Sequence, residues 1–183
     1  MERNIKIILV GSRFTGKGQI GRSWGKTEAD LPALQPVLLY DRKVEIQEFS
    51  DKPIRVVAWV LSYDPEFEGL RTSFYTDPEP DGVVLTFDLA NTTGNTLDEM
   101  KNFRNEIKKK IGFLPPQVLM GVLLSNKKEI AEDIRYKAKD WAENSGNIPY
   151  FECIYSDGKN FSENVDKAFL TLFSIITSNI EDH

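Results

Sequence analysis

The segment that most limits the fold of this chain is Gly11-Ser12-Arg13-Phe14-Thr15-Gly16-Lys17-Gly18, which lies between a strand pattern and a helix pattern. Ile5 to Val10 before it consists of Ile, Leu and Val apart from one lysine, as in a strand buried on both faces of a parallel sheet. Gly16 to Trp24 is expected to form a short helix. Glycines in such a turn let backbone N–H groups surround phosphate oxygens at the positive end of the helix. The segment therefore predicts an α/β fold with a phosphate-binding loop, and an ordinary strand-to-helix turn that uses glycine is the alternative.

Strand and helix patterns alternate along the rest of the chain, which predicts a mainly parallel sheet with helices on both faces. Six strands are expected, at residues 5–10, 43–49, 54–61, 83–88, 118–124 and 149–155. Five helices are expected, at residues 16–24, 68–75, 96–112, 130–144 and around 165–176. The strands at 43–49 and 54–61 are expected to form a hairpin, and hence the one antiparallel pair. Thr96-Leu97-Asp98-Glu99 is predicted to be a capping box that opens a helix.

Composition restricts the class of protein. With 183 residues, 40% of them apolar, we expect one domain over residues 1–183. A formal net charge of −5 argues against nucleic acid as the main partner. The single cysteine, Cys153, allows no internal disulfide, which favours a cytoplasmic protein. No apolar run approaches the roughly 20 residues of a membrane span, and neither end carries a lipidation signal, so we expect no membrane anchor in this chain.

The glycine-containing segment departs from a phosphate-binding loop only at its last position. Lys17 is expected to bridge the two outer phosphates as a point charge. The hydroxyl of a serine or threonine normally follows this lysine and holds Mg²⁺, whereas Gly18 has no side chain to offer. The residues expected to surround phosphate are Gly11, Arg13, Phe14, Thr15, Gly16, Lys17, Gly18 and Gln19.

The whole chain resembles the Ras superfamily of small GTPases, with a Rab-like character. Its landmarks are Gly11 to Gly18, Pro36-Val37, Trp59, Phe67 to Tyr75, Asp81-Gly82-Val83-Val84, Asn126-Lys127-Lys128-Glu129 and Glu152. The segment Phe67 to Tyr75 is similar to the second switch helix of that family, and this match sets the alignment for the remaining motifs. The resemblance implies a Ras-like P-loop G domain, with a six-stranded, mostly parallel sheet, that binds GDP or GTP.

In this alignment the three protein groups that surround Mg²⁺ in the family are replaced by Gly18, Val37 and Val60. None of these side chains contains an oxygen ligand, so the resemblance implies no metal site here and a nucleotide that does not require Mg²⁺. An alternative alignment, in which the strand slips by four residues, would make Asp64 a displaced metal ligand. The spacing between Trp59 and the second switch helix argues against that slip.

The residues that act in hydrolysis are also replaced. Tyr63 stands where the family has the glycine whose N–H senses the γ-phosphate, and Asp64 stands where it has the glutamine that positions water. The resemblance therefore implies that no catalytic residue is retained and that GTP hydrolysis is very weak or absent. Whether the chain is an enzyme is left open at this point.

The base-binding motif is better preserved. Asn126-Lys127-Lys128-Glu129 is similar to the Asn-Lys-x-Asp motif, in which the carboxylate accepts hydrogen bonds from guanine and the lysine methylenes cover the base. Ile154-Tyr155-Ser156 stands where a backbone N–H meets the guanine carbonyl. The residues that the resemblance assigns to guanine are Asn126, Lys127, Glu129, Tyr155 and Ser156. A polar turn with Asn126 as a helix N-cap is the alternative interpretation of the first motif.

Three functions are compatible with these motifs. The first is an atypical guanine-nucleotide-binding protein with a regulatory or effector protein at its switch surface, meaning the segments 36–39 and 63–75. The second is a nucleotide-free pseudo-GTPase that acts as an interaction scaffold, with Tyr63, Phe67 and Phe74 as aromatic anchors. The third is a working GTPase whose missing groups come from a partner protein.

Overall fold

The computed structural model describes residues 4–27, 35–45, 53–125 and 128–181 of the chain. Within these residues a six-stranded sheet has the order β2-β3-β1-β4-β5-β6. Its strands are β1 (Asn4–Val10), β2 (Val37–Val44), β3 (Ile54–Leu61), β4 (Gly82–Asp88), β5 (Gln117–Leu123) and β6 (Tyr150–Ile154). The β2–β3 pair is antiparallel and the other four pairs are parallel. The expected six-stranded, mostly parallel sheet is confirmed.

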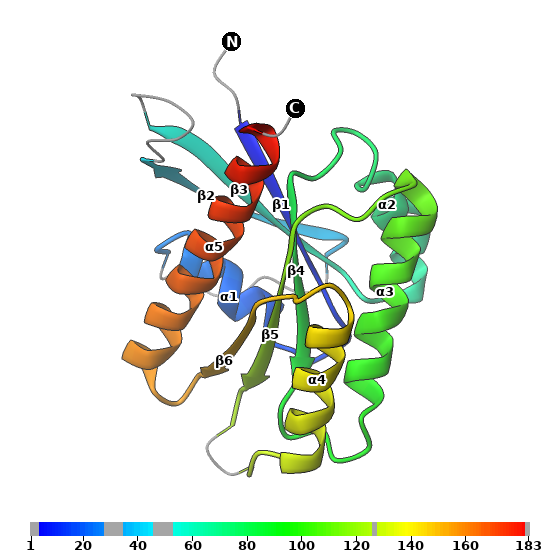
Figure 1. Ribbon diagram of the computed structural model, residues 1–183, viewed down its shortest axis with the longest axis vertical. Helices are drawn as coiled ribbons and strands as arrows, with labels where there is room; N and C mark the ends of the chain where they lie inside the picture. Colours follow the sequence, from blue (N-terminus) through cyan, green and yellow to red (C-terminus); the bar gives the residue numbers. More distant parts are fainter. Residues whose placement is uncertain (1–3, 28–34, 46–52, 126–127, 182–183) are drawn as a thin grey trace.

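Helices cover both faces of the sheet (Figure 1). They are α1 (Lys17–Trp24), α2 (Glu68–Ser73), α3 (Asn95–Ile111), α4 (Glu132–Asn144) and α5 (Gly158–Glu181), and a 3₁₀ turn, η1 (Pro65–Phe67), precedes α2. The helices α1 and α5 pack on one face, and α2, α3 and α4 on the other. None of the described helices is long and apolar enough to cross a membrane.

Each face of the sheet has its own apolar core. On the α1–α5 side, Trp24 stacks on Phe169, with ring centroids 4.2 Å apart and 6° between the ring planes. Phe173 meets the same indole edge-on at 5.6 Å. The face of α5 that the sequence predicts to be apolar is buried at all six positions, which are Val165, Ala168, Phe169, Leu172, Phe173 and Ile176. The first helix of the chain, which carries Lys17 at its start, is therefore anchored to the last helix.

Two local predictions are wrong. The strand expected at 43–49 is instead β2, which begins at Val37, and residues 46–49 of the prediction lie outside the described residues. Pairing with β3 decides these bounds, because Val37 lies opposite Leu61 and Val44 lies opposite Ile54. The apolar run at 37–40 therefore belongs to the hairpin, and the alternation at 43–49 alone placed the strand too late.

The expected capping box is also wrong. The N-cap of α3 is Gly94, which has a left-handed conformation (φ 75°) and makes no side-chain capping bond. Thr96 lies inside the first turn, and its hydroxyl accepts a hydrogen bond from the N–H of Asp88 at 3.1 Å. The Thr96 hydroxyl therefore bonds to the end of β4 and not to the backbone of its own helix, as a capping box would require. Because this contact joins two separate elements, the local sequence does not show it.

The topology gathers several loops at one edge of the sheet. The strands β1, β3, β4, β5 and β6 run parallel, so their carboxyl ends meet at this edge. The loop 11–16 follows β1, residues 62–64 follow β3, and residues 155–157 follow β6. Open α/β sheets bind ligands at this edge.

Candidate functional site

The loop after β1 packs tightly against the neighbouring strands. A Cβ added at Gly11 would lie 2.2 Å from Oγ1 of Thr86, and one added at Gly16 would lie 2.6 Å from Cγ1 of Val122. Gly16 is also the N-cap of α1 and has a left-handed conformation (φ 79°). The hydroxyls of Thr15 and Thr86 lie 2.7 Å apart, which fixes the loop to β4. These contacts explain why the loop needs glycine at both positions.

Lys17 is buried beneath this loop, with 8% of its surface exposed. Its Nζ donates hydrogen bonds to the carbonyl oxygens of Gly11 and Ser12, at 2.7 and 2.6 Å. Burial, the larger cause, and the positive charge of Arg71, the smaller one, together lower the pKa of Lys17 to about 7, against the opposing negative charge of Glu99. Among the described residues, the hydrogen-bond acceptors of this group are the two neutral carbonyl oxygens, and a charged acceptor would bind it more strongly.

A pocket of about 340 Å³ opens above the loop. The loop forms one wall, and residues from β2, β3 and the segments after β3 and β5 form the others. It is lined by Arg13, Phe14, Thr15, Gly16, Lys17, Gly18, Gln19, Gln35, Leu38, Val60, Leu61, Ser62, Tyr63 and Leu124. Two of these described residues are cations, Arg13 and Lys17, and none is a carboxylate. Such a lining suits an anion.

The structure brings together seven of the eight residues that the sequence assigns to phosphate. These seven residues, 13–19, all line the pocket, whereas Gly11 lies outside the lining and supplies a carbonyl acceptor for Lys17. The loop also carries a left-handed residue that is not glycine, Phe14 (φ 58°), whose side chain is 69% exposed. An aromatic residue in this conformation is uncommon.

The residues at the expected Mg²⁺ positions do not fit a metal ion. Gly18 and Val60 line the pocket, whereas Val37 packs against the core on the opposite face of the sheet. Mg²⁺ prefers oxygen ligands, and a glycine hydrogen and a valine methyl group offer none. Among the described residues there is no group of three or more His, Cys, Asp or Glu side chains that could hold a metal.

Tyr63 and Asp64 follow β3, and their side chains lie in different places. Tyr63 lines the pocket, and its ring centroid is 5.7 Å from Nζ of Lys17. Asp64 lies outside the lining, and its carboxylate accepts a hydrogen bond from the N–H of Glu66 at 2.9 Å, where it caps η1. The structure therefore places an aromatic ring, and not a carboxylate, against the phosphate loop.

Sequence reasoning missed Arg71, which holds the segment after β3. Only 4% of this residue is exposed, and its Nη1 donates to the carbonyl oxygens of Ser62 at 3.1 Å and Asp64 at 3.3 Å. Its other nitrogens meet Glu106 of α3. Arginine in a short helix is ordinarily exposed, so no local signal marks this residue as buried.

A second pocket, of about 450 Å³, adjoins the first, because Gln19 lines both. It contains Tyr155 and Ser156, two of the expected guanine-binding residues. The Tyr155 ring meets Phe161 edge-on at 5.2 Å, and its hydroxyl accepts a hydrogen bond from Nη2 of Arg22 at 2.6 Å. Glu129 is exposed, and Asn126 and Lys127 lie outside the described residues. The contact of Arg22 with Tyr155 was not expected, because nothing in the residues around Arg22 indicates a contact with the segment after β6.

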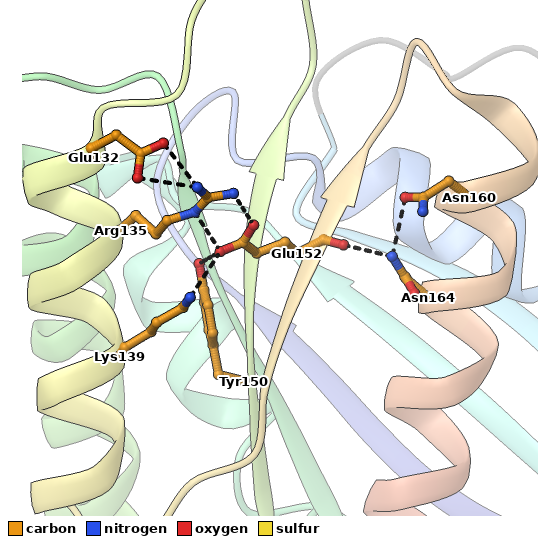
Figure 2. A network of polar contacts seen from close by, with 7 residues as sticks. All are labelled: Glu132, Arg135, Lys139, Tyr150, Glu152, Asn160 and Asn164. Carbon is orange, nitrogen blue, oxygen red and sulfur yellow. Dashed lines mark hydrogen bonds and ion pairs between the residues drawn. The ribbon is translucent and has the colours of Figure 1, made fainter.

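The strand before Tyr155 is fixed by a polar network around Glu152 (Figure 2). Arg135 of α4 donates to both carboxylate oxygens of Glu152, and the Tyr150 hydroxyl donates to Oε1 at 2.9 Å. From the other side, Asn164 of α5 donates to the Glu152 carbonyl oxygen at 2.8 Å. Burial opposes the charge of Glu152, but hydrogen bonds from Arg135 and Tyr150 lower its pKa. The network joins α4, β6 and α5, and so supports the loop that carries residues 155 and 156.

Comparisons with known proteins place this chain among proteins of one family. A family model described as the Ras family matches residues 6–178. The chain is 30% identical to "Ras-related protein Rab7" of Vigna aconitifolia over 182 residues, which cover 96% of this chain and 83% of that protein. It is 25% identical to "Ypt/Rab-type GTPase ypt7" of Schizosaccharomyces pombe (97% and 84% covered) and 27% identical to "GTP-binding protein yptV5" of Volvox carteri (82% and 73% covered).

Proposed function

This chain belongs to the Ras superfamily of small GTPases and is Rab-like, and from that premise we propose that it binds GDP or GTP in the pocket above the loop 11–18. The observation that carries the proposal is the buried Lys17, which ends a glycine-containing loop and lines a pocket with no carboxylate among its described residues. The relatives named above are GTP-binding or Rab proteins by their descriptions.

Lys17 and the loop backbone hold the phosphates in this proposal. In the structure, Nζ of Lys17 is hydrogen-bonded to two neutral carbonyl oxygens. A phosphate oxygen is a charged acceptor, so it competes well for the ammonium group and favours its protonated form. The N–H groups at the start of α1 point toward the same region and favour negative charge. The phosphate-binding residues are thus Gly11 and residues 13–19.

We propose further that binding depends little or not at all on Mg²⁺. The positions from which the family supplies metal ligands are occupied by Gly18, Val37 and Val60, and the first and last of these line the pocket without any oxygen ligand. Removing Mg²⁺ from a protein that does not ligate the ion changes its nucleotide affinity little. This property would set the protein apart from a GTPase with an intact metal cage.

Hydrolysis of GTP is proposed to be very weak or absent. Phosphoryl transfer needs groups that neutralise the developing charge and orient the attacking water. Asp64, at the position of the water-positioning residue, is engaged with the N–H of Glu66 and lies outside the lining. Tyr63 occupies the wall of the pocket instead.

The base is proposed to lie beside the loop that follows β6, where Tyr155 and Ser156 line the second pocket. Asn126, Lys127 and Glu129 complete the proposed guanine site. The two pockets adjoin at Gln19, so the ribose of a nucleotide could connect a base there to phosphates in the first pocket. Backbone N–H groups of the loop can meet the guanine carbonyl irrespective of the side chains that the loop carries.

The remaining features of the proposal concern context. We treat residues 1–183 as one G domain of a cytoplasmic protein, with no nucleic-acid partner, in keeping with its net charge of −5 and single cysteine. A regulatory or effector protein is proposed to bind at the switch surface. There Leu39 and Leu70 are 56% and 50% exposed, which suits a protein contact.

A nucleotide-free scaffold is the second candidate function, and one observation favours it. Lys17 is hydrogen-bonded to Gly11 and Ser12, and Arg71 ties Ser62 and Asp64 to α3, so the protein's own groups hold the loop and the segment after β3 in place. A pseudo-GTPase that presents a fixed switch surface has this arrangement.

Two measurements decide between these functions. First, the purified protein is denatured and the released nucleotide is identified by chromatography. Second, a fluorescent GDP analogue is titrated with excess Mg²⁺ and again with EDTA. We expect guanine nucleotide binding and equal affinities in the two titrations. A loss of tenfold or more with EDTA, about 1.4 kcal/mol, would contradict Mg²⁺ independence, and no binding in either titration would favour the scaffold.

A further inference from the structure

We propose that the guanidinium group of Arg13 neutralises the outer phosphate of the bound nucleotide, in place of the divalent ion for which the side chains of Gly18, Val37 and Val60 offer no ligand. The inference rests on the proposed function, because it assumes a nucleotide whose phosphates lie at the loop 11–18. It assigns a specific role to one side chain, whereas a phosphate loop ordinarily acts through its backbone and its lysine.

The charge of the pocket calls for a second cation. A terminal phosphate carries about 1.5 to 2 negative charges near neutral pH, and a nucleoside diphosphate has a further charge on its inner phosphate. Lys17 supplies at most one positive charge, and the other described residue of the lining with a positive charge is Arg13. An anion that enters with only Lys17 as partner therefore retains excess charge in a pocket partly lined by Leu38, Val60 and Leu61, which is unfavourable.

The position of Arg13 suits this role. Its guanidinium carbon lies 4.7 Å from the ring centroid of Phe14, so the exposed aromatic ring supports the charged group beside the pocket. Among the described residues, Arg13 forms no ion pair with a carboxylate and stays exposed. A guanidinium group held by a cation–π contact at an exposed site is easily transferred to a phosphate, because that contact is weak compared with a charge-assisted hydrogen bond.

Arg71, whose positive charge acts on Lys17, is not available for this role. It is buried and already bonded to Glu106, Ser62 and Asp64. Arg13, in contrast, presents a planar fork of donors that matches two oxygens of one phosphate. Lys17 and Arg13 would then act on the phosphates from two sides, as a buried point charge and as an exposed fork.

The test compares Arg13→Ala and Arg13→Lys with the parent protein, in EDTA, by competition of GDP against a fluorescent GDP analogue. Arg55→Ala is the matched control, because it removes an exposed arginine from the amino end of β3, away from the loop. Thermal unfolding of each nucleotide-free variant shows whether the fold is intact. Arg13→Ala is then titrated again with guanidinium chloride at low concentration, and with an equal concentration of sodium chloride.

We expect Arg13→Ala to weaken GDP binding by about tenfold or more, as for the loss of a charge-assisted hydrogen bond, and Arg13→Lys to retain part of the affinity. Free guanidinium should restore part of the affinity of Arg13→Ala, and sodium should not. Arg55→Ala should bind as the parent does. If the parent binds GDP and Arg13→Ala binds it equally well, or if guanidinium and sodium act alike, this inference is wrong while the proposed function stands. A parent protein that binds no GDP overturns the proposed function itself.

Discussion

Arg71 of α2 and Glu106 of α3 form a two-point ion pair, in which Nε lies 3.1 Å from Oε1 and Nη2 lies 3.3 Å from Oε2. The Arg71 side chain is 5% exposed, and the Tyr75 hydroxyl donates to the same carboxylate at 2.8 Å. Burial opposes the charge of Arg71, but the bonds to Glu106 raise its pKa. This pair ties the segment after β3 to α3.

Glu106→Gln should destabilise the fold, because it removes the charge that compensates a buried guanidinium. Breaking a fully buried pair costs about 3–5 kcal/mol, and the partial exposure of Glu106 reduces the expected loss to about 2 kcal/mol. Urea denaturation measures the loss. The double variant Arg71→Met, Glu106→Gln should recover part of it, since no unpaired charge is left. Unchanged stability in Glu106→Gln would show that solvent already compensates Arg71.

GDP affinity should fall as the pH rises from about 7 to about 8.5. In the nucleotide-free protein the pKa of Lys17 is lowered to about 7, so the group is largely neutral above that pH. Phosphate binding favours the charged form and raises this pKa, so binding takes up a proton across this range, and the affinity falls by up to about tenfold per pH unit. Titrations at several pH values measure the slope. Lys17→Met should bind weakly at every pH without this slope, and a parent protein without a slope would contradict the lowered pKa of Lys17.

Lys17→Ala should weaken GDP binding more than any single substitution in residues 60–64. With no oxygen ligand in the side chains of Gly18 and Val60, Lys17 is the principal buried counter-charge, and one charge-assisted hydrogen bond is worth about 1.5–3 kcal/mol. The comparison uses Tyr63→Ala, which also lines the pocket. Affinity in Lys17→Ala equal to that of the parent would mean that the loop is vestigial, and would favour the scaffold function.

Single-turnover GTP cleavage should be slower than about 10⁻⁴ s⁻¹, below the intrinsic rate of an ordinary Ras-like protein. Asp64→Gln alone should not restore it, because residue 64 caps η1 and lies outside the pocket lining. The rate of phosphate release is measured for the parent protein and for Asp64→Gln. Catalytic groups that act as a unit do not restore the rate when only one of them is replaced. The variant with the best prospect of Mg²⁺-dependent turnover combines Gly18→Ser, Val37→Thr, Val60→Asp, Tyr63→Gly and Asp64→Gln. Ordinary Mg²⁺-stimulated cleavage by the parent or by Asp64→Gln would show that the metal site has been misplaced.

Gly11→Ala should destabilise the protein by about 2 kcal/mol or more, because the new methyl group would lie 2.2 Å from Oγ1 of Thr86 and 2.6 Å from its backbone oxygen. The matched control is Gly69→Ala in α2, where no atom beyond the neighbouring residues and the helix's own backbone lies within 4 Å of the added Cβ. That change should be neutral or stabilise the helix by up to about 1 kcal/mol. Thermal unfolding of both variants measures the difference, and equal midpoints would contradict the close packing of the loop on β4.

Most of the fold could be predicted from the sequence because its signals are local. The apolar run at 5–10, the glycines and lysine of 11–18 and the amphipathic face of α5 are patterns of neighbouring residues, and the structure has a strand, a loop and a helix there. Seven of the eight residues assigned to phosphate line one pocket for the same reason, since they are consecutive. The predictions of where β2 starts and of Thr96 as a helix cap were wrong. The contacts that decide them are made with β3 and with Asp88, which belong to other elements of the fold.

The order of strands and helices, the position of the glycine-containing loop and the absence of side-chain oxygen ligands at Gly18, Val37 and Val60 are all readable in the residues themselves, because they follow from residue type and spacing. Which side chains are buried, and which distant ones pair, depends on how the elements pack. Arg71 and Glu106 are 35 residues apart, and Arg22 and Tyr155 are 133 apart, so no local pattern could pair them. The pKa of Lys17 likewise depends on its burial and on the charge of Arg71, and both exist only when β1, α1 and α2 are packed together.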